Sequence, residues 1–148
     1  MMKSFSLNKV MAMAVCCLAL AGNAFAVIPQ VDGVYQIGTC QDLRDFSTLV
    51  NGGNTSANAK LVADINMAEC SSLGNFTPIG VDAGSKYVGT FEGDGKIINA
   101  LTIHLPTANK QYGGLFGYVG SSGVVKDVIV YGGFKSSMQH VRDSVQSE

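Results

Sequence analysis

The sequence predicts an all-β fold, a short solenoid made of stacked turn-and-strand units. The composition supports this class, because 18 glycines, few charged residues (14%) and many β-branched side chains are typical of turn-rich β-proteins. An internal echo indicates the solenoid. GTFEG at residues 89–93 returns as GLFGY at 114–118, and INALTI at 98–103 returns as VKDVIV at 125–130. These offsets of 25 and 27 residues are typical of solenoid repeats, whose units bury their apolar faces only by stacking on one another.

The first 26 residues are typical of a secretory signal peptide. Lys3 and Lys9 make the start positive, residues 10–21 form an apolar run, and Ala24-Phe25-Ala26 fits the A-x-A cleavage rule. The apolar run is shorter than the roughly 20 residues that a membrane-spanning helix needs. The sequence therefore predicts export of a mature chain without a membrane span. The expected location is secreted, extracellular or at the cell surface, with the periplasm as the alternative.

The net charge of the mature chain argues against some classes of binding partner. Removing the signal takes away two lysines and no acidic residue, which lowers the formal net charge from −1 to about −3. A mildly acidic chain with no basic cluster is a poor candidate for binding nucleic acid or an anionic membrane. A glycan or an extracellular protein is the expected partner.

Two of the four cysteines, Cys40 and Cys70, remain in the mature chain. In an exported protein such a pair is expected to form a disulfide. Closing a loop of about 30 residues would stabilise the fold by roughly 3–4 kcal/mol. Two free thiols are the alternative, and a metal site would need ligands that only His104 and His140 remain to supply.

Residues 27–133 are predicted to form the single domain, with one helix near its start. Thr39 and Asp42 have the spacing of a capping box, and apolar residues recur at helical intervals between 40 and 50. We expect this helix to cover the apolar end of the first solenoid unit, which would otherwise face water as an open edge. Residues 134–148 are polar and lack a strand pattern, so a short helix or a disordered tail is expected there.

Several motifs in order resemble the GLUG-motif repeat proteins, which are bacterial secreted or surface proteins. The motif proper is Gly114-Leu115-Phe116-Gly117 with the strand that follows at 124–130, preceded by PIG at 78–80 and GTFEGDG at 89–95. The resemblance covers about residues 34–131. It implies a right-handed parallel β-helix and an adhesin-like role. Together with the helix expected at about residues 40–50, the predicted fold is a short right-handed parallel β-helix with an N-terminal capping helix. The resemblance implies no cofactor and no catalytic residues.

The β-helix interpretation makes a specific prediction about strand stacking. Ile98 is expected to stack on Val125, and Leu101 and Ile103 are expected to stack on Val128 and Val130. A β-sandwich is the alternative arrangement of short strands and glycine turns, although it gives no reason for the internal echo.

Two sets of residues are candidates for a site. Glu92 and Asp94 would share a face if extended, and two carboxylates can serve acid–base chemistry or hold calcium, although a glycine-rich turn also favours aspartate. Four tyrosines could form an exposed strip for glycan or surface contact, or pack turns: Tyr87, Tyr112, Tyr118 and Tyr131. A solvated His104 is favoured over a catalytic base.

The expected function is that of a secreted or cell-surface β-helix module, adhesin-like and non-catalytic, that binds a glycan or a host or matrix surface. Neither a metal nor a cofactor is expected. One alternative is a carbohydrate-active enzyme of β-helix type, a polysaccharide lyase or hydrolase. The other is a truncated fragment of a longer surface protein.

Overall fold

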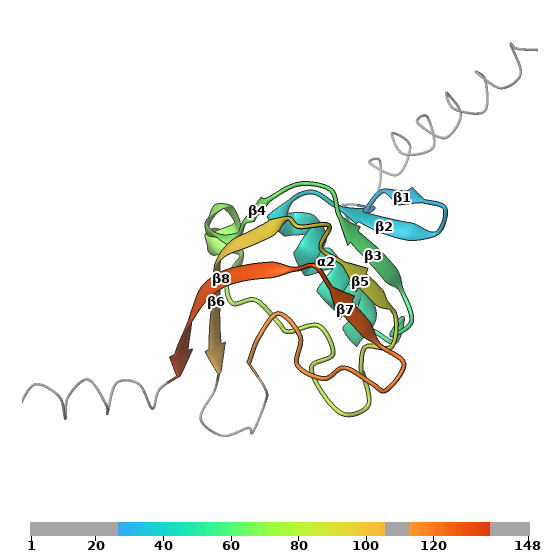
Figure 1. The fold of residues 1–148 in the computed structure, drawn as a ribbon. Coiled ribbons are helices and arrows are strands. Elements are labelled where there is room, and N and C mark those ends of the chain that lie inside the picture. Colours follow the sequence, from blue (N-terminus) through green and yellow to red (C-terminus); the bar gives the residue numbers. More distant parts are fainter. Residues whose placement is uncertain (1–26, 106–112, 137–148) are drawn as a thin grey trace, which may run out of the picture.

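The computed structural model describes residues 27–105 and 113–136 (Figure 1). The predicted signal, residues 1–26, lies outside them. The elements follow in the order β1 (Gln30–Val31), β2 (Val34–Ile37), α2 (Cys40–Asn51), β3 (Asn58–Leu61), β4 (Ile65–Asn66), the 3-10 helix η2 (Met67–Leu73), β5 (Thr90–Glu92), β6 (Ile97–Leu105), β7 (Val124–Lys126) and β8 (Ile129–Ser136).

The strands form two sheets. One has five strands in the order β1-β2-β3-β5-β7, and only its first pair, β1 with β2, is antiparallel. The other has three parallel strands in the order β4-β6-β8. In Figure 1 the strands β3, β5 and β7 lie side by side, and α2 lies behind them.

Helix α2 forms where the sequence predicts it. The Thr39 hydroxyl accepts a hydrogen bond from the Asp42 amide, and the Asp42 carboxylate accepts from the Thr39 amide, which completes the capping box. One face of the helix is buried, and it includes Leu43, Phe46 and Val50. These are the positions of its helical apolar spacing.

Part of the core lies between α2 and the five-stranded sheet. The Phe46 ring centroid is 5.8 Å from that of Tyr35 on β2 and 5.9 Å from that of Phe91 on β5. Tyr87, just before β5, lies 6.1 Å from Phe46 with its ring edge-on. Phe46, Tyr87 and Phe91 have no exposed surface. The helix therefore packs across the face of the sheet.

The prediction of an all-β solenoid with a capping helix is wrong. The described residues form a mixed α/β arrangement with two helices and with both parallel and antiparallel strand pairs. The physical reason is the place of α2, which fills the interior with Phe46 instead of closing one end. Its apolar face is thus satisfied by the sheet face and not by an open edge.

The predicted stacking is also wrong in its register. Val125 pairs with Phe91 and not with Ile98, and Ile98 pairs with Val130. Farther along β6 and β8, Leu101 pairs with Gly132 and Ile103 pairs with Phe134. A register shift separates Ile98 from Leu101, where Ala100 has a positive φ of 56°. The strands are nevertheless parallel at each of these pairs.

The register predicted from the internal echo is wrong because residues 114–118 do not pair with residues 89–93. Phe116 of the GLFG motif pairs with Ile79, and Val119 pairs with Tyr87, each in a single parallel bridge. The backbone of the GLFG segment therefore pairs with the PIG segment at 78–80 and not with strand β5. Gly117 fits this approach, because a Cβ there would lie 2.6 Å from the carbonyl oxygen of Gly80.

The disulfide between Cys40 and Cys70 is present, which confirms the prediction, with the two Cα atoms 6.0 Å apart. It joins the first turn of α2 to η2. Strand β8 runs to Ser136, so the expected polar tail from residue 134 begins inside a strand, and residues 137–148 lie outside the described part.

Candidate functional site

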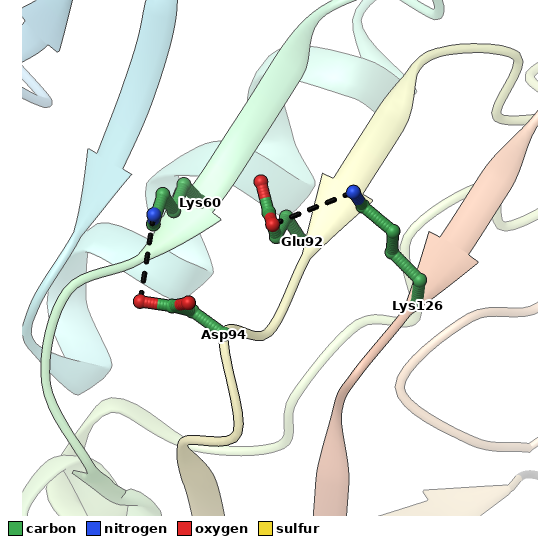
Figure 2. Close-up of polar contacts among 4 residues, drawn as sticks. All are labelled: Lys60, Glu92, Asp94 and Lys126. Atoms are coloured by element: carbon green, nitrogen blue, oxygen red, sulfur yellow. Dashed lines mark ion pairs between the residues drawn. The ribbon is translucent and has the colours of Figure 1, made fainter.

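Four charged residues meet on the outer face of the five-stranded sheet. Lys60 on β3, Glu92 on β5 and Lys126 on β7 occupy one row, because Lys60 pairs with Glu92 and Glu92 pairs with Lys126 in the strand register. Asp94 lies in the turn after β5, where its φ is 52°. We call these four residues the charged row (Figure 2).

Each carboxylate of the charged row has its own lysine. Lys126 Nζ lies 3.4 Å from Glu92 Oε1, and Lys60 Nζ lies 3.4 Å from Asp94 Oδ2. Figure 2 shows that the Lys126 side chain extends from β7 toward Glu92 on β5, whereas Asp94 lies beside Lys60 on β3. The row is therefore electrically balanced, with two positive and two negative side chains.

This geometry favours a structural role for the charged row. The four side chains are between 34% and 50% exposed, so each pair contributes about 0–1 kcal/mol of stability in water. A catalytic carboxylate pair or a calcium site at Glu92 and Asp94 stays a prediction. Within residues 27–105 and 113–136, no three His, Cys, Asp or Glu side chains are placed to hold a metal ion together.

The four tyrosines do not form one exposed strip. Tyr87 is fully buried, and its hydroxyl donates a hydrogen bond to the Ala57 carbonyl oxygen at 2.8 Å. Burial raises the pKa of the Tyr87 phenol. The prediction of a surface contact is therefore wrong for Tyr87, because its ring fills the core. Tyr118 is partly buried, Tyr131 on β8 is 58% exposed, and Tyr112 lies outside the described residues.

His104 belongs to strand β6 and not to a loop. Its backbone amide donates to Asn75 Oδ1, and its carbonyl oxygen accepts from Asn75 Nδ2, both at 2.8 Å. The Asn75 side-chain amide thus makes the two backbone hydrogen bonds that a neighbouring strand would make. These contacts use the backbone of His104 and give its ring no chemical role.

A set of exposed apolar side chains lies on the last strands of the two sheets. In the described part of the chain, no further strand pairs with the outer edge of β7 or of β8. Five side chains of these strands are at least 40% exposed: Val124, Val125, Ile129, Val130 and Tyr131. We call this surface the open edge.

The open edge continues two buried rows of the core. Ala59 on β3 and Phe91 on β5 are buried, and Val125 is the next residue in their row, 40% exposed. The second sheet repeats this pattern, since Val130 follows Ile98 in its row and is 41% exposed. These two valines are exposed because no further strand follows them in the row of the described residues. They lie on the same face of their sheets as the buried residues Phe91 and Ile98.

Sequence reasoning missed both features for the same reason. Lys60 and Lys126 are far from Glu92 along the chain, and only the parallel register brings the three together. Val125 and Val130 read as core residues because their strands alternate like buried ones. The alternation shows which face a residue takes, but it does not show that a strand is the last of its sheet.

Comparison of the chain with models of protein families, with curated proteins and with solved structures finds no match. The resemblance to GLUG-motif proteins therefore stays a prediction from the motifs. In the part of the chain that the structure describes, no helix has the length and apolar character needed to cross a membrane.

Proposed function

We propose that this chain is an exported, non-catalytic and adhesin-like interaction module that binds an extracellular protein along the open edge. The exposed valine rows are the observation on which the proposal depends. Apolar residues gathered on an unpaired strand edge are typical of protein interaction sites. The Cys40–Cys70 disulfide is compatible with an extracellular location, and the predicted signal peptide supplies the route.

The partner is expected to present an extended segment that adds a strand beside β7. Strand addition satisfies unpaired backbone N–H and C=O groups and places alternate side chains in fixed positions. A parallel segment would place one residue over Val125 and the next over Lys126, as Phe91 and Glu92 stand on the other side. The first should be apolar, to cover the row of Phe91.

The charged row predicts the second residue of that segment. Lysine, glutamate and lysine alternate along Lys60, Glu92 and Lys126. An acidic residue opposite Lys126 would continue this alternation, and opposite charges on neighbouring strands attract. The preferred segment is thus an extended strand with an apolar residue followed by an acidic one.

The experiment measures binding of the disulfide-bonded mature chain to immobilised extracellular-matrix proteins and to a glycan array. Size-exclusion chromatography with light scattering first selects a folded monomer. Val125→Lys and Val130→Lys should each weaken protein binding at least tenfold, because they place a charge in the apolar row. Leu73→Lys is the matched control, since Leu73 is 51% exposed on η2 and belongs to neither β7 nor β8.

Three results would contradict the proposal. One is that a folded monomer binds none of the matrix proteins. Another is glycan binding that survives both valine substitutions, which would move the site away from the open edge. The third is self-association through the edge that Val125→Lys abolishes, since the occupant would then be a second copy.

A further inference from the structure

A groove of about 400 Å³ lies between the first described residues and helix α2. Its walls include the apolar side chains of Val27, Ile28 and Leu49 and the ring of Tyr35. The one charged side chain among the residues that line it is that of Asp45. The groove is thus mostly apolar with a single carboxylate.

Only one oxygen of the Asp45 carboxylate has a partner. Oδ1 accepts a hydrogen bond from Gln41 Nε2 at 2.8 Å, one turn earlier on the helix. Oδ2 is buried and finds no hydrogen-bond partner in the part of the chain that the structure describes. A buried charged oxygen without a partner costs stability and calls for an explanation.

Neither Arg44 nor Lys60 supplies that partner. The guanidinium of Arg44, the next residue on α2, donates to the carbonyl oxygens of Leu73, Gly74 and Asn75. Lys60 pairs with Asp94 on the outer face of the sheet. Both cations are therefore engaged elsewhere, and Asp45 Oδ2 can accept from a donor that enters the groove.

The predicted cleavage site lies directly beside this groove. Hydrolysis by a leader peptidase adds water across the bond between Ala26 and Val27, leaving a carboxylate on Ala26 and an ammonium group on Val27. In the precursor this nitrogen is a neutral amide with one N–H. In the mature chain it carries a positive charge and three donors, with a pKa near 8.

The chain after Val27 is held in place. Ile28 is 5% exposed, the Pro29 carbonyl oxygen accepts from the Gln36 amide at 2.7 Å, and Gln30 pairs with Tyr35 in the β1–β2 ladder. Val27 is thus one residue from an anchored position, and it lines the same groove as Asp45.

We infer that Asp45 is the acceptor for the new N-terminus: signal removal places the Val27 ammonium against Asp45 Oδ2 and locks the first strand onto helix α2. The ion pair forms only after cleavage. The mature chain is therefore more stable than any form that carries residues before Val27, and maturation and folding are coupled.

A thermodynamic cycle tests this inference. One axis compares the chain that begins at Val27, released by a specific protease, with a chain that has one extra glycine before Val27. That glycine moves the ammonium by about 3.5 Å along the chain. The other axis compares Asp45 with Asp45→Asn, which keeps an acceptor for Gln41 and the side-chain size. Mass spectrometry of exported protein checks that natural cleavage occurs before Val27.

With Asp45 present, the extra glycine should raise the unfolding equilibrium constant about tenfold or more, as expected for a hydrogen bond between charged groups. In the Asp45→Asn variant the same extension should change that constant less than twofold. Thr48→Ala is the matched control, because Thr48 lines the groove on the same helix and carries no charge. Its extension penalty should equal that of the unsubstituted chain.

Two results would overturn the inference. An extension penalty that is equal with Asp45 and with Asp45→Asn would mean that the ammonium acts elsewhere or not at all. Saturable stabilisation of the Val27 chain by n-butylammonium, lost in Asp45→Asn, would mean that the groove is open to an external amine. If Asp45→Asn does not fold, N-acetylation of the Val27 chain replaces it: an acetylated chain as stable as the free one also contradicts the pairing.

Discussion

Replacing Phe46 with alanine tests the placement of helix α2 across the sheet. The ring is fully buried and lies within 6.1 Å of three other aromatic rings, those of Tyr35, Tyr87 and Phe91. Its removal takes away apolar burial and leaves a cavity that neighbouring rings fill only in part, a loss of about 3–5 kcal/mol. Small domains have a free energy of unfolding of about 5–15 kcal/mol, so this is a large part of the total.

Urea unfolding of the disulfide-bonded chain, followed by circular dichroism, measures the effect. For a slope of about 1.5 kcal/mol per molar urea, the midpoint should fall by roughly 2–3 M. Thr48→Ala is the control, because Thr48 is exposed on the same helix and should change stability by less than about 0.5 kcal/mol. A helix that merely covered one end of the strands would contact fewer rings. A loss below about 1 kcal/mol in Phe46→Ala would therefore refute the central position of the helix.

Three further predictions follow from local geometry. Gly93→Ala should cost about 1–3 kcal/mol in a thermal melt, because a Cβ there would lie 2.1 Å from the carbonyl oxygen of Asp127; an unchanged melting temperature would contradict this close approach. Removing the disulfide by changing Cys40 and Cys70 together to alanine should cost roughly 3–4 kcal/mol in urea unfolding, whereas reduction without destabilisation would contradict it. Hydrogen bonds from Ser85 hold the pKa of Asp82 below its usual value near 3.8. The ionised carboxylate therefore stabilises the folded state fully above that pH, and this stabilisation is lost as pH falls through the lowered pKa. Asp82→Asn should flatten that part of an acid-unfolding curve, and an unchanged curve would contradict the prediction.

Local features were predictable from the sequence where a few neighbouring residues decide them. Helix α2 follows from the Thr39–Asp42 cap and from the spacing of Leu43, Phe46 and Val50, and it lies where it was expected. The disulfide follows from the two cysteines that remain after the predicted signal. Both inferences depend on short-range rules or on simple pairing.

Register was not predictable because several glycine-flanked aromatic segments look alike. Phe91 and Phe116 have similar neighbours in sequence, yet Phe91 belongs to strand β5 and Phe116 pairs with Ile79. Their rings pack against each other with centroids 5.2 Å apart. An echo in sequence shows that two segments are similar in type. It does not show that they are neighbours in one sheet.

Some glycines are required by the close approach of two backbones and not by a turn. Gly95 has a positive φ of 71°, as a turn requires. At Gly89, however, a Cβ would lie 2.2 Å from the carbonyl oxygen of Ala57 on the neighbouring segment. The constraint there is the distance between two backbones, which no property of the local sequence displays.

The two ends of the five-stranded sheet differ in a way that supports the open edge as the interaction surface. At one end, β1 has two residues and follows Pro29, and short strands and prolines are common means of protecting an edge. At the other end, β7 is the last strand of its sheet, and β8, which follows it in the chain and has eight residues, is the last strand of the other sheet. Val125 and Val130 there extend buried rows that begin at Ala59 and Ile65. Within the described residues, one edge is protected and core rows are exposed at the other, and such rows lose stability to solvent exposure unless a further strand covers them.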